Sequence, residues 1–264
     1  MSDPAPIVRI FDAAAEAYEN VGAGFFAPIA AELVRAAAPR PGERALDAGC
    51  GTGEVLFRVA SAVGHTGHVT GIDLAAGMVA RSRANATGLG NVTVEPGDAQ
   101  APAYPDGGFD LITSGLVLFF LPDPPAALAA YRKLLKPSGR LAVSCFARHD
   151  PRYPQAMRIL ARFALDPPPP RRDHPIFDSA ERLEAAVVAA GFASATAREA
   201  AVATGFSDAA HLYEWIGSHG GRDLVERIPR QRRAAAIATL ATQLDHPLLF
   251  TTRIRIVLGR CGCG

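Results

Sequence analysis

Between about residues 44 and 147 the sequence alternates short apolar, β-branched runs with alanine-rich stretches of helical length. We expect strands at residues 44–48, 68–72, 91–95, 109–113 and 140–146. We expect helices between them at residues 53–63, 75–86 and 125–135, the last one framed by proline at its start and a Pro-Ser-Gly stop after its end. Strands that alternate with helices form a parallel sheet covered by helices. The pattern therefore predicts an α/β fold.

The carboxyl-terminal part has a different pattern. Gly191 follows an expected helix at residues 178–190, for which Asp178 is the expected N-cap. Further strands are expected at 195–204 and 250–258, the second from its alternation of apolar and polar residues. The stretch between them, 205–247, reads as mostly helical, and a proline-rich stretch lies at 149–177.

Composition limits the possible partners. The sequence has 27 Lys and Arg against 26 Asp and Glu, which gives a formal charge of +1 and no excess of positive charge to hold a nucleic acid. No signal peptide or membrane-spanning run is recognisable, so we expect a cytoplasmic protein without a membrane partner. The four cysteines are too few and too scattered for a disulfide framework, and no metal site is expected.

The most informative segment is residues 45–53, an apolar strand that runs into the glycine-rich turn D-x-G-x-G-x-G before a helix. Glycine lets the backbone approach a ligand closely, and the helix N-terminus presents unpaired amides. Two acids follow the next two strands: Asp73, where it can accept from both hydroxyls of a ribose, and Asp98, where it can accept from an adenine amino group. A nicotinamide dinucleotide site and a methyltransferase site both use such a turn, although the G-x-G-x-x-G spacing of the former is absent.

Taken together, the turn at 47–53, Asp73-Leu74 with Met78, Gly97-Asp98-Ala99, and residues 109–112 followed by Leu-Pro-Asp-Pro at 121–124 resemble the class I S-adenosylmethionine-dependent methyltransferases. The branch that it resembles is the ubiquinone/menaquinone-biosynthesis-like and small-molecule, natural-product one. The resemblance implies a Rossmann-like seven-stranded sheet of order 3-2-1-4-5-7-6 with an antiparallel last strand. It also implies a helical cap at 1–43 over the cofactor site, and a domain at 44–264 with lid insertions at 149–177 and 205–247.

The resemblance further implies S-adenosylmethionine as cofactor and a role for each matching residue. Residues along the methionine part would be Gly49, Gly51, Gly53, Ser114 and Leu116, with Asp47 organising the turn or meeting the amino group. Residues around the nucleoside would be Asp73 at the ribose, and Leu74, Met78, Asp98 and Ala99 near the adenine. Tyr18 resembles a tyrosine that covers the cofactor. Cys50 lies in the turn and is expected to act as a small packing residue.

The insertions are expected to surround the methyl acceptor. Their apolar walls would come from Phe25, Phe26, Phe119, Phe120, Phe177, Tyr213 and Trp215, although each aromatic ring could instead only hold the lid helices together. Relatives often carry histidines where this chain has Phe119-Phe120, so a mechanism based on those histidines does not transfer. His149, His211 and His219 are the candidates for a base or a group that orients the acceptor.

These residues predict methyl transfer to an oxygen, nitrogen or carbon atom of a small, partly apolar or aromatic metabolite, by in-line displacement that depends mainly on proximity. The alternatives are a protein that binds S-adenosylmethionine without methyl transfer, as a scaffold or a rearrangement catalyst, and a nicotinamide-dependent oxidoreductase. A monomer or a homodimer is expected.

Overall fold

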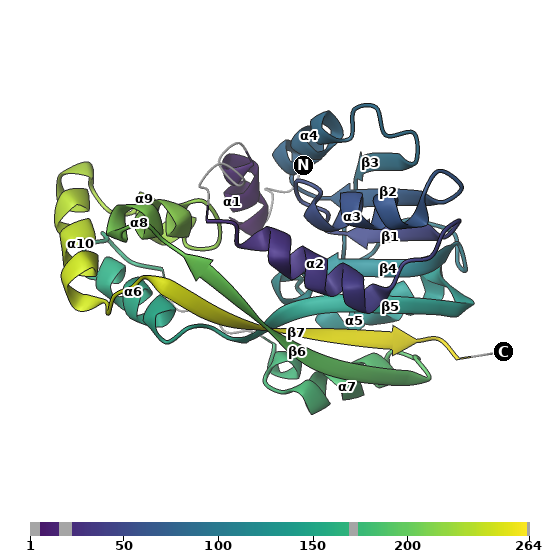
Figure 1. The fold of residues 1–264 in the computed structure, drawn as a ribbon. Coiled ribbons are helices and arrows are strands. Elements are labelled where there is room, and N and C mark those ends of the chain that lie inside the picture. Colours follow the sequence, from purple (N-terminus) through teal and green to yellow (C-terminus); the bar gives the residue numbers. More distant parts are fainter. Residues whose placement is uncertain (1–5, 16–22, 169–173, 263–264) are drawn as a thin grey trace. The chain divides into compact units, whose positions relative to one another are not determined.

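The computed structural model describes residues 6–15, 23–168 and 174–262 (Figure 1). Within them, seven strands form one sheet of order β3-β2-β1-β4-β5-β7-β6, as the resemblance implied. The strands are β1 Arg44–Ala48, β2 His68–Asp73, β3 Val92–Pro96, β4 Phe109–Gly115, β5 Leu135–Arg148, β6 Ser194–Gly205 and β7 Leu249–Arg260.

Strand pairing gives the sheet its direction. β1 lies parallel between β2 and β4, so that Leu46 is opposite Thr70 on one side and Ile112 on the other. β3 and β5 extend this parallel arrangement outward. β6 and β7 run in opposite directions, as the arrows in Figure 1 show, which confirms the expected antiparallel last strand. Because parallel strands end at one edge, the turns after β1 to β4 all lie at that edge.

Helices cover the sheet because alternate strand side chains point to opposite faces. α2 (Phe26–Ala37) and α3 (Glu54–Val63) pack on each other, and on β4 and β1 respectively. On the other face, Leu46 and Ile112 join a buried cluster with Tyr131 of α5 (Pro124–Leu134) and Val187 of α7 (Ala180–Ala189). α4 (Ala76–Asn85) contacts β2 and β3.

Two expected boundaries were wrong. The N-cap of α7 is Ser179, whose hydroxyl accepts from the Arg182 amide at 3.2 Å, whereas Asp178 forms an ion pair with the Arg182 guanidinium. β5 starts at Leu135 rather than at Arg140. Leu135 already pairs with Phe109, and the register then shifts before Arg140 pairs with Leu111, so the prolyl segment interrupts the ladder without ending the strand.

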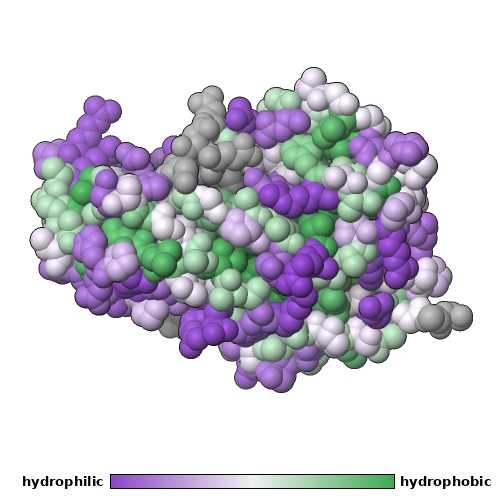
Figure 2. Space-filling model, in the orientation of Figure 1, coloured by the Kyte–Doolittle hydropathy of each residue, from purple (hydrophilic) through white to green (hydrophobic). Residues whose placement is uncertain are grey.

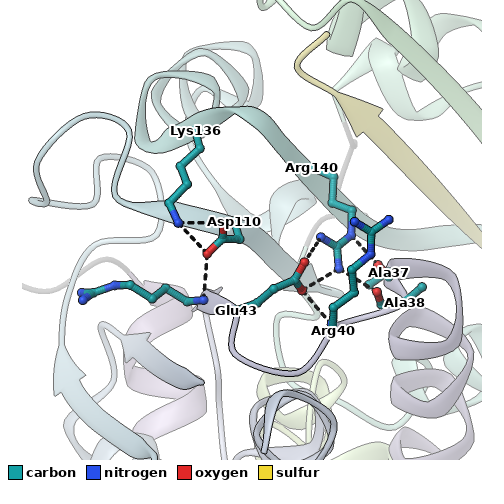
Figure 3. Close-up of polar contacts among 8 residues, drawn as sticks. Ala37, Ala38, Arg40, Glu43, Asp110, Lys136 and Arg140 are labelled. Carbon is teal, nitrogen blue, oxygen red and sulfur yellow. Dashed lines mark hydrogen bonds and ion pairs between the residues drawn. The ribbon is translucent and has the colours of Figure 1, made fainter. Parts of the chain in front are cut away.

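Partly buried ion pairs join the amino ends of the central strands (Figure 3). The Arg140 guanidinium donates to both carboxylate oxygens of Glu43 at 2.7 and 2.8 Å, and to the carbonyls of Ala37 and Ala38, each at 2.7 Å. Bidentate geometry makes this a strong charge-assisted contact. It fixes the end of α2 to β1 and β5, at the edge of the sheet opposite the glycine turn.

The chain divides into two compact units. The sheet unit comprises residues 26–147, 173–200 and 254–264, and the helical unit comprises residues 1–25, 148–172 and 201–253. The helical unit contains α1 Pro6–Ala14, α6 Arg152–Ala161, α8 Ala209–Gly217, α9 Arg222–Glu226 and α10 Arg230–Gln243. α8 packs on α9 and α10, and α10 packs on α6.

Surface hydrophobicity is broken into patches. Figure 2 shows hydrophobic areas interrupted by hydrophilic residues on the face in view. The large exposed hydrophobic side chains are spread along the chain: Leu74, Leu89, Leu165, Val188 and Leu249. Among the described residues, no helix has the length and apolar character needed to cross a membrane.

Candidate cofactor and acceptor sites

The glycine turn joins β1 to α3 through three glycines in the left-handed region. Gly49, Gly51 and Gly53 have φ values of 78°, 54° and 108°, which side chains with a Cβ rarely adopt. The amides of Gly49 and Cys50 both donate to the Ile72 carbonyl at 2.8 Å. The turn is therefore held against the end of β2 by its own backbone.

The space around these glycines differs. A Cβ on Gly49 would lie 2.5 Å from Val117, and a Cβ on Gly53 would lie 2.1 Å from the Phe57 ring. A Cβ on Gly51 would meet nothing within 4 Å. Gly49 and Gly53 are thus required for packing, whereas the Gly51 backbone faces open space that a ligand can enter.

Asp73 holds this turn at the end of β2. One of its carboxylate oxygens accepts from the Gly51 amide at 2.9 Å, and the other accepts from the Ala75 amide at 2.9 Å. A carboxylate has further acceptor sites beyond these two contacts, so it can also bind hydroxyl groups of a ligand. Beside it, Leu74 is 56% exposed, whereas Met78 is buried in the core.

Asp47 is buried beneath the turn with an incompletely satisfied carboxylate. Its side chain is 1% exposed, and the Thr113 hydroxyl donates to Oδ1 at 2.7 Å. Oδ2 has no hydrogen-bond partner among the described residues. Burial is the main cause that raises the Asp47 pKa to about 7, and the charge of Asp73 contributes. A positive group of a ligand placed here would stabilise the ionised carboxylate.

Cys50, in the same turn, is buried. Burial and the neighbouring charges of Asp47 and Asp73 raise the pKa of its thiol. A thiol that stays protonated is a poor nucleophile. This environment fits the expected packing role.

At the end of β3, Asp98 is exposed and accepts from the Gln100 amide at 2.8 Å. Ala99 is buried, and its carbonyl accepts from the hydroxyl of Tyr131 at 2.6 Å. Tyr131 positions this loop from beneath, and no sequence pattern indicated it. Gln100 in turn accepts from the Asp123 amide at 2.8 Å.

The end of β4 supplies a strained residue and a buried one. Leu116 has a φ of 58°, and its amide donates to both the carbonyl and the hydroxyl of Ser144 at 3.2 Å. Non-glycine residues in this region cluster at functional sites, where the surrounding structure holds them. Ser114 is fully buried, and its hydroxyl has no partner among the described residues.

Phe119 and Phe120 belong to a group of phenylalanine rings in the sheet unit. Phe119 lies 4.5 Å from Phe120, 5.5 Å from Phe146 and 6.2 Å from Phe177 between ring centroids. Phe26 begins α2 in the same unit. The expected aromatic pair is thus part of a larger group, to which Phe146 is an addition that the sequence did not indicate.

A second aromatic group lies in the helical unit, around Trp215 on α8. The Trp215 ring lies 5.1 Å from Phe25, 5.9 Å from Tyr153, 5.0 Å from Phe206 and 4.3 Å from His219 between centroids. We call these five residues the Trp215 cluster. Tyr153 and Phe206 were not foreseen, because they come from segments with no motif.

The three candidate histidines all lie in the helical unit, in different environments. His211 accepts from the Ser207 amide at 3.2 Å through Nδ1, a contact that stabilises the start of α8. His149 stacks on Tyr153 at 4.9 Å. Burial is the main cause that lowers the pKa of His219 to about 4, so His219 is neutral at pH 7.

The two tyrosines expected at the cofactor and acceptor sites are Tyr18 and Tyr213. Tyr18 lies outside the described residues. Tyr213 is buried on α8, and its hydroxyl has no partner among the described residues. No group of three or more His, Cys, Asp or Glu within the described parts of the chain could hold a metal ion.

Comparison with known proteins identifies the family. A family model described as a methyltransferase domain matches residues 39–164. Nocamycin O-methyltransferase from Saccharothrix syringae is 34% identical over 95% of this chain and 97% of that protein. The chain belongs to the S-adenosylmethionine-dependent methyltransferases. It is an enzyme that transfers a methyl group from S-adenosylmethionine to a small molecule.

Two further similarities agree with this assignment. Aklanonic acid methyltransferase DauC from a Streptomyces species is 41% identical over 52% of this chain and 63% of that protein. The crystal structure of an S-adenosylmethionine-dependent methyltransferase from Aquifex aeolicus has a TM-score of 0.51 and 22% identity, over 69% of this chain and 88% of that one. At that identity the structural similarity supports the fold.

The residues of the glycine turn fit the cofactor of this methyltransferase. The open side of Gly51 leaves room beside the backbone, and the unpartnered oxygen of Asp47 can accept from an ammonium group. Asp73 retains acceptor capacity for ribose hydroxyls. All three lie at the carboxyl ends of parallel strands, where such folds bind ligands.

Proposed function

We propose that this methyltransferase methylates an oxygen atom of a small metabolite of the natural-product type. The observation that carries the proposal is the similarity to nocamycin O-methyltransferase along almost the whole of both chains. Aklanonic acid methyltransferase, also similar, is named for an acid with oxygen atoms to methylate.

We propose the following roles for the cofactor site. Gly49, Gly51 and Gly53 line the methionine part, and Asp47 accepts from its amino group. Leu116, with Ser114 beneath it, borders the same part. Asp73 binds the ribose, and Leu74, Met78, Asp98 and Ala99 surround the adenine. The hydrogen bonds from Gly51 and Ala75 to Asp73 support this assignment, because they hold the carboxylate in one position at the end of β2.

Bound S-adenosylmethionine supplies a methyl group on a positively charged sulfur atom, with a neutral thioether as leaving group. The residues of the chain contribute mainly by orienting the cofactor and by excluding water. Holding two reactants in line can contribute about 7 to 11 kcal/mol to lowering the barrier. No covalent enzyme intermediate is required.

An acceptor with an O–H group must lose a proton. We propose His149 for this step, since it directly follows β5, at the ligand-binding edge of the sheet, and stacks on Tyr153. His219 is a poor base because its pKa is lowered to about 4. His211 is proposed to position α8, because Ser207 already donates to its ring.

Acceptor contacts are proposed in each unit separately. In the sheet unit, the apolar wall of Phe119, Phe120 and Phe177, with Phe26, would exclude water. In the helical unit, Phe25, Tyr213 and Trp215 would contact the acceptor. The insertions at 149–177 and 205–247 would then act as a lid and residues 1–43 as a cap. We also propose a cytoplasmic monomer or homodimer that needs no nucleic acid, which agrees with the formal charge of +1.

Incubation with S-adenosylmethionine that carries a carbon-13 methyl group tests the proposal. Candidate acceptors would present hydroxyl or carboxyl, amine, and activated carbon atoms on one ring scaffold. The chemical shift of the transferred methyl identifies the atom that receives it. We expect methyl–oxygen products only; methyl–nitrogen or methyl–carbon products would overturn the choice of atom, and cofactor binding without any product would overturn methyl transfer.

A further inference from the structure

The Trp215 cluster joins three segments that are far apart in the sequence. Phe25 precedes α2, Tyr153 lies in α6, and Trp215 lies in α8. His149 extends the cluster through its stacking on Tyr153. All of these residues belong to the helical unit, so the group is defined within one compact body.

Burial is uneven across this group. Phe25 is 5% exposed and Trp215 is 6% exposed, so both rings form a buried base. The rings with polar atoms, those of His149, Tyr153 and His219, stay partly exposed. These three polar rings therefore keep some contact with solvent, which a group that served only to pack helices would not require.

An unsatisfied polar atom marks the same place. The Trp215 indole N–H is buried and has no hydrogen-bond partner among the described residues. A buried donor left unpaired is unfavourable, and an oxygen atom of a ligand that accepts from it would remove this cost.

The charges near the cluster disfavour a cationic ligand. The Asp150 carboxylate is already bound by the Arg152 guanidinium through two contacts of 2.8 Å, and by the Thr251 amide. His219 supplies no negative charge.

We propose that the Trp215 cluster binds a planar, conjugated, oxygen-bearing ring of the methyl acceptor, with Tyr153 and Trp215 as the residues that determine its specificity. This inference rests on the proposed function. The flat ring packs against Tyr153 and His219, and its oxygen accepts from the Trp215 indole N–H. Edge-on and offset contacts between aromatic rings favour such a ligand over a saturated ring of equal size.

The chain has one tryptophan, which allows a site-specific measurement. Full-length protein labelled with 5-fluorotryptophan gives a single fluorine-19 resonance, from Trp215. It would be titrated, with S-adenosylhomocysteine present, with 3-hydroxy-2-naphthoate, with a saturated bicyclic hydroxy acid of equal charge, and with choline. We expect the naphthoate to shift the resonance saturably and the saturated acid to bind about tenfold more weakly or less, with no shift from choline.

Variants separate a binding role from a structural one. Tyr153→Leu should raise the Kd for the naphthoate at least about tenfold, a loss of about 1.4 kcal/mol, and leave the Kd for S-adenosylhomocysteine unchanged. Tyr153→Phe should retain most of the affinity, because it keeps the ring. His65→Gln, at an exposed position in the sheet unit, is the control that should change neither Kd.

Three results would overturn the inference: no shift with the naphthoate, equal affinity for the saturated acid, or a shift with choline. If S-adenosylhomocysteine still binds and methyl transfer still occurs, only the inference fails. If the wild type neither binds S-adenosylhomocysteine nor transfers a methyl group, the proposed function itself fails.

Discussion

Acidification should quench the fluorescence of Trp215 with a midpoint near pH 4. Protonated imidazole quenches a neighbouring indole, and the His219 and Trp215 rings lie 4.3 Å apart. Burial is the main cause that lowers the His219 pKa from 6.5 to about 4, and the charge of His149 lowers it further, against the Trp215 carbonyl, which raises it. Since Trp215 is the only tryptophan in the sequence, the signal reports this site alone.

The same shift predicts an effect on stability. The unfolded chain binds a proton at His219 below pH 6.5, whereas the folded chain resists protonation down to about pH 4. The free energy of unfolding therefore falls as the pH drops from 6.5 to about 4. Below pH 4 the whole contribution of His219 is lost. A difference of 2.5 pH units at 1.36 kcal/mol per unit gives an upper value of about 3 kcal/mol.

Urea unfolding of the wild type and of His219→Gln at pH 7 and pH 4 measures this effect, and the difference between the proteins removes the contribution of other groups. Between pH 7 and pH 4, the free energy of unfolding of the wild type should fall by up to about 3 kcal/mol more than that of the variant. The variant should also show no fluorescence quenching near pH 4. A quenching midpoint near pH 6.5, or equal losses in both proteins, would refute the argument that His219 is held neutral.

Three further predictions concern the sheet unit. Asp47, with a pKa raised to about 7, should release a proton when cationic S-adenosylmethionine binds at pH 6. Calorimetry in buffers of different ionisation enthalpy detects the proton release, which should vanish at pH 8.5 and in Asp47→Asn. If the wild type releases no proton at pH 6, Asp47 does not face the positive charge of the cofactor. Gly51→Ala and Gly88→Ala both place a side chain at positive φ in open space, so each should cost about 1 kcal/mol of stability, but only Gly51→Ala should weaken cofactor binding, by about tenfold or more. Arg140→Met leaves the partly buried Glu43 carboxylate without its partner and should lower the free energy of unfolding by about 2 kcal/mol, measured with urea, and Glu43→Gln in the same protein should restore part of it; no loss would show that the ion pair is unimportant.

The parallel part of the sheet and the cofactor turn could be predicted from the sequence because their signals are local, whereas the order of the strands was implied by the resemblance to a known family. Alternation of strands and helices indicated the parallel part, and the D-x-G-x-G-x-G turn requires a conformation that few residues other than glycine adopt. The helix start at residues 178–179 was predicted one residue early, because Asp178 and Ser179 are both good N-caps. Pro137 concealed the early start of β5.

The Trp215 cluster could not be predicted in full for a different reason. Its rings come from three distant segments, and neither Tyr153 nor Phe206 stands in a motif. Tyr131 illustrates the same limit, since its hydroxyl contacts Ala99 through the fold and not through any spacing. Such residues become visible only when the chain is folded.

The most direct test of the cofactor site is calorimetric titration of S-adenosylmethionine and S-adenosylhomocysteine into the wild type and Asp73→Ala. Asp73 accepts from the Gly51 and Ala75 amides, so its removal takes away the support of the turn together with the proposed ribose contact. We predict micromolar binding by the wild type and a loss of at least about tenfold, or 1.4 kcal/mol, in the variant. Absence of binding to the wild type, or equal affinity in both proteins, would contradict the account.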